Sequence, residues 1–268
     1  MSNISTEYQA LREAIQLSQG KLNIKCTYFS DVRLVRLQKD SKTRFIFGYC
    51  FDINPEAAAE LANDKAAMYE VMVVSEIAAV PHYLLSNVIK PTVSLHELVS
   101  LFEKHEKLVI KPNNGNKGEM VAKFDHPEEA LKYIEDNPKI SWSASQYIDI
   151  AREIRIVVLN GTAKLACEKI KPKMMNGLRM YNLTLGATAK GIKVSDIVSS
   201  VIKLAEQSVQ AIGLNMGAVD VVLDQDGNPY VLEINDGFSL ERFALSSDEA
   251  HIEVVRFYEE AIAELFKD

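Results

Sequence analysis

Two acidic side chains and an amide lie at regular spacing near the end of the chain. Residues 217–235 read as two apolar strands joined by a turn at 226–228, a pattern typical of a β-hairpin. Side chains alternate between the faces of a strand, so Glu233 and Asn235 share a face and an antiparallel partner can bring Asp220 onto it. Such a set is typical of an oxygen-ligand site for Mg²⁺ that bridges to substrate phosphates. The alternative is a surface hairpin with a solvated polar face.

A second group combines lysines with a glycine-containing loop. Lys111 ends an apolar strand and precedes the loop 113–118, in which Gly115 and Gly118 let the backbone approach an anion and Lys117 adds charge. The loop lacks both the Gly-Lys-Ser/Thr of a Walker A motif and the glycine spacing of a Rossmann turn. An ordinary Gly/Asn hairpin fits it equally well. The loop gains weight because the C-terminal hairpin independently predicts a metal and phosphates.

Arg155 and Lys169 are further candidates for binding an anion. Arg155 shares a strand face with Glu153, and its guanidinium can bind a γ-phosphate or an acyl phosphate through two hydrogen bonds. The alternative is a structural ion pair with Glu153 or a surface carboxylate. Lys169 fits an anion site and, equally, a solvated lysine. The histidines are scattered, and most are predicted at the surface. With no recognisable catalytic triad, the predicted chemistry is electrostatic stabilisation of a transferring phosphoryl group.

The elements that must position these residues are a mixture of strands and helices. Asn54 and Pro55 predict a helix start, with Asn54 as the N-cap and Pro55 as the first helical residue. Strands are predicted at 142–150 and 154–160, and an amphipathic helix at 196–212. Several hairpins among helices predict an α+β fold.

Composition and charge restrict the class of protein. The 268 residues are 47% hydrophobic and 25% charged, which is typical of a globular protein. The net charge of -7 argues against a general nucleic-acid or anionic-membrane surface, although a local basic groove is compatible with it. No apolar run approaches the ~20 residues that span a bilayer, and the N-terminus does not read as a signal peptide. Three widely spaced cysteines predict free thiols in a reducing cytoplasm.

Taken in chain order, these residues resemble the ATP-grasp superfamily, and its RimK-like carboxylate–amine ligases in particular. The resemblance runs from about Asn54 to the end of the chain, and the joint order of its motifs is more specific than any one of them. The motifs are Asn63-Asp64-Lys65, Val109-Ile110-Lys111-Pro112, Ser145-Gln146-Tyr147-Ile148, Glu153-x-Arg155, Asn182-Leu183-x-x-Gly186-Ala187, Asp220 and Glu233-x-Asn235.

The resemblance implies an α+β ATP-grasp fold in which two α+β lobes sandwich ATP and Mg²⁺, or Mn²⁺, bridges its phosphates. Residues 1–53 would form a short N-terminal α/β segment on the substrate side. Either the usual N-terminal domain is reduced here, or a partner chain completes the substrate site. Residues 54–268 would form the ATP-grasp domain, with a small lobe at about 81–147 and a large lobe at about 148–268.

The resemblance also implies a role for each site residue. The nucleotide-binding set would be Lys65, Lys111, Asn114, Gly115, Asn116, Lys117, Gly118, Gln146, Tyr147, Ile148 and Asp149. In this set the lysines and the 113–118 loop bind phosphates, residues 146–148 meet adenine through their backbone, and Asp149 lies near the ribose. Arg155 and Lys169 would be the catalytic residues near the transferring phosphoryl group. The metal ligands would be Asp220, Glu233 and Asn235.

The implied reaction activates a carboxylate with ATP to an acyl phosphate, which an amine, or less often a thiol or hydroxyl, then attacks. ADP and phosphate leave. The expected partners are small-molecule or peptide carboxylates and amines, with no nucleic acid and no membrane, and a homodimer is one option. The alternatives are a kinase on the same fold and a catalytically silent nucleotide-binding module. Residues 236–240 depart from the family, whose members often have small residues and Pro-Gly there, and this leaves the acceptor open.

Overall fold

The centre of the molecule is an antiparallel sheet of five strands. The computed structural model describes residues 7–29, 33–115 and 118–267. The strands of the sheet are β9 (Arg152–Leu159), β10 (Thr162–Ile170), β13 (Thr188–Ile192), β14 (Met216–Leu223) and β15 (Pro229–Asn235). Their order is β13-β10-β9-β14-β15. The predicted C-terminal hairpin is therefore present as β14–β15, and it pairs with β9, which is distant in sequence.

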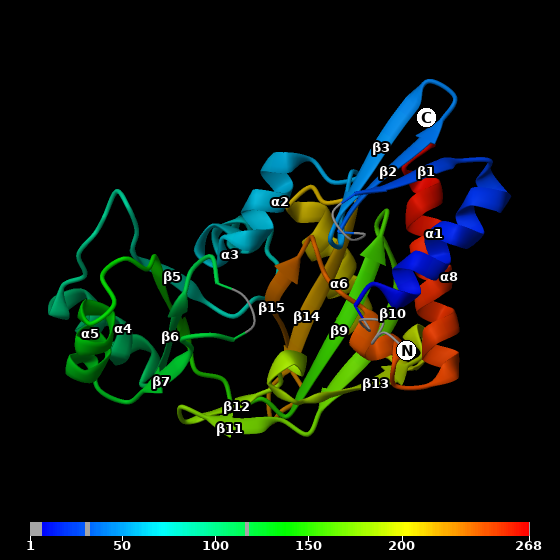
Figure 1. The fold of residues 1–268 in the computed structure, drawn as a ribbon. Coiled ribbons are helices and arrows are strands. Elements are labelled where there is room, and N and C mark those ends of the chain that lie inside the picture. Colours follow the sequence, from blue (N-terminus) through cyan, green and yellow to red (C-terminus); the bar gives the residue numbers. More distant parts are fainter. Residues whose placement is uncertain (1–6, 30–32, 116–117, 268) are drawn as a thin grey trace, which may run out of the picture.

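Helices cover both faces of this sheet (Figure 1). One face carries α1 (Gln9–Leu22), α7 (Glu241–Ala244) and α8 (Asp248–Glu264), and the other carries α2 (Glu56–Asn63), α3 (Lys65–Val74) and α6 (Ser199–Ala211). Along β9, Val157 and Leu159 pack with the first group, and Ile156 and Val158 pack with the second. Because both faces are covered, a charged side chain on β9 or β14 needs a partner.

A smaller sheet lies to one side of the large one, on the left in Figure 1. Its strands, in spatial order, are β5 (His82–Ser86), β8 (Trp142–Gln146), β6 (Leu108–Pro112) and β7 (Ala122–Phe124). Helices α4 (Leu95–His105) and α5 (Pro127–Glu135) cover one face around Leu98, Ile134 and Trp142. The opposite face carries buried polar side chains, namely His82, Lys111, Ser143 and Ser145.

The N-terminal segment forms a third layer against α8. It consists of α1 and a four-stranded antiparallel sheet, β1 (Lys25–Phe29), β2 (Leu34–Lys39), β3 (Lys42–Phe47) and β4 (Cys50–Phe51). Val35, Leu37 and Ile46 are buried in one hydrophobic cluster with α1 and α8. The remaining elements are the hairpin β11 (Lys173–Met175) and β12 (Leu178–Met180) and the 3-10 turns η1 (Leu183–Leu185) and η2 (Val194–Asp196).

The predicted N-cap role of Asn54 is wrong. Helix α2 begins at Glu56, and Pro55 occupies the cap position with an extended backbone. The Asn54 side chain accepts hydrogen bonds from the N–H groups of Asn215 and Met216, both at 2.9 Å, and donates to the Met216 carbonyl at 2.8 Å. Asn54 therefore ties the chain to the start of β14, and a bond between distant segments replaces the local one.

Two predicted boundaries also shift. The strand predicted at 142–150 ends at Gln146, because its partner β6 begins at Leu108, directly opposite. The helix predicted at 196–212 begins at Ser199, because the turn η2 occupies the residues before it. None of the helices in the described part of the chain is long and apolar enough to span a membrane.

Candidate active site

A cluster of buried charges connects β9, β10 and β14. Arg155 lies opposite Asp220, and its Nε and Nη2 donate to the two carboxylate oxygens at 2.8 Å each. Lys169 donates to Asp220 at 2.7 Å and to Glu153 at 2.5 Å. The side chains of Asp220 and Lys169 are 0% and 5% exposed. Arg155 is thus in a structural ion pair, as one alternative held, but its partner is the buried Asp220 and not Glu153 or a surface carboxylate.

The charges in this cluster shift one another's pKa. Burial by itself would raise the pKa of Asp220, but Arg155 and Lys169 hold it below its usual range. Burial opposes the charge of Lys169, yet Asp220 and Glu153 raise its pKa. Burial raises the pKa of Glu153, and Lys169 offsets only part of that. At neutral pH, therefore, Asp220 is ionised and both cations are charged.

The three predicted metal ligands share one face of the hairpin. Glu233 lies opposite Asp220, and Asn235 lies opposite Ala218. Glu233 is close enough to Asp220 to influence its pKa. Two carboxyl groups in contact repel each other unless a proton or cation lies between them. The Asn235 Nδ2 is buried with no hydrogen-bond partner among the described residues, and such a group is costly unless a ligand engages the amide.

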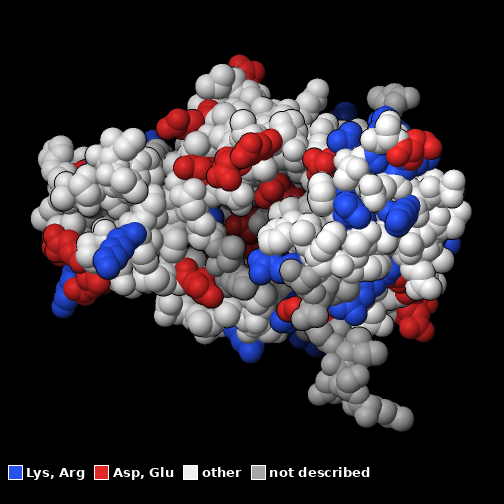
Figure 2. All heavy atoms as spheres, turned by 45° about the horizontal axis from the view of Figure 1, so that its top comes forward, with Lys and Arg blue, Asp and Glu red and all other residues white. Residues whose placement is uncertain are grey.

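This donor set fits Mg²⁺ only if a ligand completes it. Among the described residues, no three His, Cys, Asp or Glu side chains form a metal-binding group. Two carboxylates and one amide are a partial oxygen shell, of the kind that Mg²⁺ completes with phosphate oxygens and water. Figure 2 shows acidic side chains at the rim of, and inside, a hollow in the middle of the surface.

Lys65 and Lys111 are both buried, each with 8% of its surface exposed. Lys65 is the first residue of α3, where Asp64 caps the helix by accepting from the Ala67 N–H at 2.9 Å. The Lys65 ammonium donates to the carbonyls of Asn113 and Gly115 at 3.3 and 2.6 Å. It therefore holds the start of the 113–118 loop against α3.

The charge of Glu233, on the metal-ligand face, influences the pKa of both lysines. Burial lowers the pKa of Lys65, and Glu233 opposes that effect. Burial, followed by the charge of Lys65, lowers the pKa of Lys111 to about 7, and Glu233 again opposes it. Glu233 therefore acts on lysines from both α3 and β6. Two neighbouring buried ammonium groups are typical of a site that binds an anion.

The glycine loop packs against the segment that follows β12. Gly118 has a φ of +72°, and a Cβ there would lie 2.8 Å from Met180 Cε and 3.3 Å from Asn182 Nδ2. Asn114 is exposed and close to the Lys65 contact at Gly115. Asn116 and Lys117, which the resemblance places among the phosphate-binding residues, lie outside the described residues. The described ends of the loop thus lie between β6 and β12.

The predicted adenine segment follows β8. The Tyr147 N–H donates to the Lys107 carbonyl at 3.1 Å, so a base would meet other peptide groups of Gln146 and Ile148. Asp149, predicted near the ribose, is exposed, and its carboxylate lies 3.7 Å from Arg179.

His82 is a polar group near the site that no sequence pattern singled out. It is 2% exposed, not at the surface, and it lies opposite Ser145 on the polar face of the small sheet. Its Nδ1 is 2.7 Å from the Val80 carbonyl, which only accepts, so Nδ1 carries the proton. Its Nε2 is then an acceptor, buried and without a partner among the described residues. Burial, then the charge of Lys111, lowers the His82 pKa well below its usual value.

Residues 236–240, where the chain departs from the family pattern, join the site to the N-terminal segment. Phe238 and Leu240 are buried with α1 and α8. The next residue, Glu241, accepts hydrogen bonds from two N–H groups in the first turn of α1, at 3.0 and 3.3 Å. This carboxylate satisfies helix donors that would otherwise be unpaired. The difference from the family pattern at residues 236–240 is therefore explained by the contact of this stretch with α1 and α8.

Replacing Gly237 by alanine is expected to lower the free energy of unfolding by about 1–3 kcal/mol. A Cβ at 237 would lie 2.3 Å from Cys50 Sγ, so β4 or Cys50 must move. Urea unfolding measures the loss. Cys50→Ala removes the sulfur, and the double variant is expected to recover most of the stability. A double variant as unstable as Gly237→Ala alone would show that this contact is not the cause.

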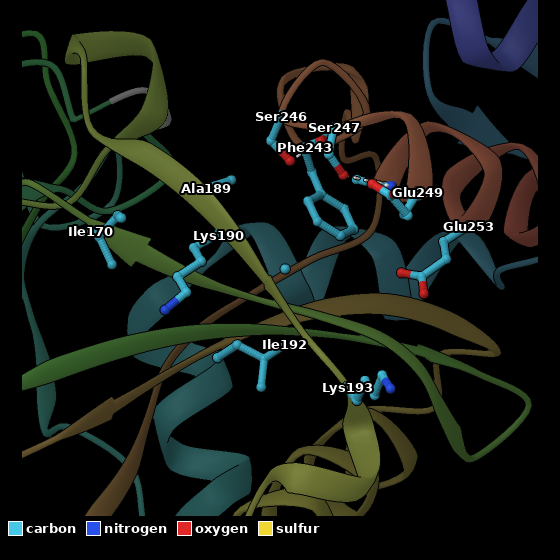
Figure 3. A pocket seen from close by; sticks show the side chains of 12 residues that line it. Ile170, Ala189, Lys190, Ile192, Lys193, Phe243, Ser246, Ser247, Glu249 and Glu253 are labelled. Atoms are coloured by element: carbon cyan, nitrogen blue, oxygen red, sulfur yellow. Dashed lines mark hydrogen bonds between the residues drawn. The ribbon is translucent and has the colours of Figure 1, made fainter.

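A separate cavity of about 470 Å³ lies between β13 and the helices α7 and α8 (Figure 3). Lys190, Lys193, Phe243, Glu249 and Glu253 are among the residues that line it. None of the predicted site residues that the structure describes borders this cavity. The candidate active site is instead the group of charged side chains formed by the metal-ligand face of the hairpin and the two buried lysines.

The two sheets and the polar site between them have the arrangement of an ATP-grasp protein. A family model described as a RimK-like ATP-grasp domain matches residues 62–257, and the chain belongs to this family. The resemblance seen in the sequence is confirmed. No curated protein matches the sequence.

Solved structures of ATP-grasp ligases share the fold at low sequence identity. The ligase PsnB complexed with a minimal precursor is 14% identical, with a TM-score of 0.57, over 79% of this chain and 64% of PsnB. D-alanine–D-alanine ligase from Bacillus anthracis complexed with ATP is 18% identical, with a TM-score of 0.59, over 79% and 67%. The D-cycloserine synthetase DcsG is 18% identical, with a TM-score of 0.59, over 78% and 73%. The chain thus spans less than two thirds of PsnB.

Proposed function

We propose that this protein is an ATP-dependent ligase that forms an amide bond between a carboxylate and an amine through an acyl phosphate, releasing ADP and phosphate. The observation that carries the proposal is that two buried lysines, Lys65 and Lys111, lie close enough to the metal-ligand face to be influenced by the charge of Glu233. Membership of the family and the fold of the solved ligases support it. One of the PsnB structures is a complex with its precursor, Mg and ADP.

In this proposal the small-lobe side of the site binds the nucleotide. Lys65, Lys111 and the 113–118 loop bind the phosphates, and residues 146–149 bind the base and ribose. His82 offers a buried acceptor, which would repel a phosphate oxygen but accept a hydrogen bond from the adenine amino group or a ribose hydroxyl.

The opposite side of the site holds the metal and the reacting groups. Asp220, Glu233 and Asn235 would hold Mg²⁺, with Mn²⁺ as second choice, and the bound ion supplies charge neutralisation at the phosphates. Arg155 uses Nε and Nη2 on Asp220, which leaves Nη1 for a phosphoryl oxygen. Lys169 keeps Asp220 ionised and adds positive charge. These groups stabilise the charge that develops as the phosphoryl group moves.

The covalent steps use the two substrates and ATP alone. A carboxylate oxygen attacks the γ-phosphorus, and the bond from that phosphorus to ADP breaks. The amine nitrogen then attacks the acyl carbon, the bond from carbon to phosphate breaks, and the nitrogen gives up a proton. The chain's part is to position these groups and exclude water, which would hydrolyse the acyl phosphate.

A product assay tests this function directly. Amino acids, dipeptides and dicarboxylates are screened against a panel of amines with ATP and Mg²⁺, and ADP, phosphate and coupled products are measured. ADP and phosphate in equal amounts, dependent on both an acid and an amine, are expected. A kinase would give ADP without free phosphate, and a silent module would give neither. AMP as the product would overturn the proposal.

The proposal also covers the domains, the substrates and the cellular location of the enzyme. Residues 1–53 would form a short substrate-side segment next to an ATP-grasp domain at 54–268. The substrates would be a small-molecule or peptide carboxylate and an amine. The free thiols of the three cysteines fit a cytoplasmic location.

The affinity for ATP is expected to fall as the pH rises above about 7. The pKa of Lys111 is lowered to about 7 without nucleotide, whereas phosphates favour the ammonium. Binding above that pH must take up a proton, so the affinity falls by up to about tenfold per pH unit. The unfolded chain then holds the proton that folded Lys111 has lost, so the free energy of unfolding rises over the same range.

Calorimetry near pH 8, in two buffers of different ionisation enthalpy, measures the proton uptake. Lys111→Met is the matched control, and we expect it to bind ATP weakly without this uptake. Wild-type binding without proton uptake would contradict the assignment of Lys111 to the phosphates.

A further inference from the structure

The outward face of the N-terminal sheet carries three exposed aromatic rings. Phe29 on β1 and Phe47 on β3 lie in one row across the sheet, with Leu34 between them, and Phe45 is two residues along β3. The three phenylalanines are 41%, 52% and 43% exposed in that order. The opposite face of the same strands is buried against α1 and α8. The hydrophobic core therefore does not account for these rings.

Guanidinium groups lie over two of the rings. Arg33 Cζ is 4.8 Å from the centre of the Phe47 ring, and Arg36 Cζ is 5.7 Å from that of Phe29. The Arg36 Nε has no hydrogen-bond partner among the described residues. None of the nine side chains that the strand register places on this face of β1–β3 is acidic. They are Lys25, Thr27, Phe29, Leu34, Arg36, Gln38, Thr43, Phe45 and Phe47.

The charge of this segment is opposite to that of the whole chain. Residues 21–47 hold seven lysines and arginines and two aspartates, a net charge of +5 in a chain of net charge -7. Figure 2 shows lysine and arginine side chains gathered on the right, over the β1–β3 region. The segment precedes the family match at 62–257 and contributes none of the candidate site residues. The net charge of the whole chain is negative, but this segment of it is basic.

Three occupants fit such a face to different degrees. A second copy docked face to face would bring like charges together. An acidic polypeptide would use the cations but would leave the rings without planar partners. Single-stranded nucleic acid uses both, because bases stack on exposed aromatic rings while phosphates meet arginine and lysine. Exposed aromatics on antiparallel sheets hold two or three bases in this way.

We propose that the outward face of β1–β3 binds single-stranded nucleic acid, through the rings of Phe29, Phe45 and Phe47 and the cations of Arg33, Arg36 and Lys25. The binding is independent of the proposed ligase chemistry. Three phosphate contacts predict a slope of about -2 for log affinity against log salt.

Fluorescence anisotropy with labelled oligouridylate and oligodeoxythymidylate of about 12 nucleotides tests the proposal. We expect the full-length protein to bind at about 50 mM salt and more weakly at about 200 mM. Phe45→Ala and Phe47→Ala are each expected to weaken binding about tenfold. Arg36→Gln should make the salt slope shallower by about 0.7. Comparing the two oligonucleotides shows whether RNA or DNA is preferred.

Matched variants separate stacking from folding and from general stickiness. Phe45→Leu keeps apolar bulk without a ring, so it should fold as the wild type does and still bind weakly. Val88→Ala and Ile89→Ala change side chains that are 99% and 92% exposed elsewhere, and they should bind as the wild type does. No binding of either oligonucleotide overturns the proposal. The proposal is also overturned if Phe45→Ala and Phe47→Ala bind the oligonucleotides as tightly as the wild type does. The same holds if a polyglutamate peptide binds as tightly as the oligonucleotides.

Discussion

Replacing Asp220 by asparagine is expected to lower the free energy of unfolding by about 3–5 kcal/mol. Asp220 is fully buried and is the shared partner of Arg155 and Lys169. The neutral amide would take away the ion-pair partner of Arg155 and leave Lys169 paired with Glu153. Urea unfolding monitored by fluorescence and circular dichroism measures the change.

The matched control is Asp226→Asn in the exposed turn of the same hairpin, with an expected change within about 0.5 kcal/mol. The pKa of Asp220 is lower in the folded protein, so its contribution to stability is present above the unfolded pKa and is lost as the pH falls through the acid range. Asp220→Asn should remove this part of the pH dependence. Wild-type stability in the variant would show that the charge cluster does not support the fold.

Glu233→Gln is expected to lower turnover by about 10²–10³-fold while the protein stays folded. Glu233 makes none of the ion pairs of the charge cluster, so its loss spares Arg155 and Lys169. It is, however, the carboxylate that influences the pKa of both buried lysines, Lys65 and Lys111. Phosphate release measured against Mg²⁺ concentration should show a weaker apparent Mg²⁺ affinity together with the lower rate.

Glu168→Gln on β10 is the control for this effect. Glu168 pairs with Arg152 at 2.7 Å away from the site, so the variant should turn over as the wild type does. Unchanged turnover in Glu233→Gln would remove the metal assignment. The double variant with Asp220→Asn and Glu233→Gln should have no turnover.

The C-terminal hairpin could be predicted from the sequence because its signal is local. Alternating apolar residues and a glycine turn predict the hairpin, but the register counted from the turn would put Asp220 opposite Leu232. A register shift between Asp220 and Val221 brings Asp220 opposite Glu233, and only the structure shows it. The pairing of Arg155 with Asp220 could not be predicted in this way, since it depends on β9 lying beside β14. The sequence thus indicates the acidic face, and only the fold shows which cations neutralise it.

Bonds between distant segments explain the other differences. Asn54 has the residue type and position of an N-cap, yet it bonds the backbone at Met216. Glu241 caps α1 across a separation of more than 200 residues, which no local pattern reveals. His82 gives no pattern at all, and its importance comes from burial and from an unpaired Nε2. The difference from the family pattern at residues 236–240 is visible in the sequence. Its cause, the packing of this stretch against the N-terminal segment, is visible only in the structure.

The most direct test of the account is to follow oxygen from the carboxylate. An accepted carboxylic acid labelled with ¹⁸O in both carboxylate oxygens is incubated with ATP, Mg²⁺ and the amine, and the released phosphate is analysed by mass spectrometry. Because the acyl phosphate breaks between carbon and oxygen, the account predicts one ¹⁸O atom in each phosphate, with ADP as the other product. Unlabelled phosphate, or label found in AMP, would contradict it.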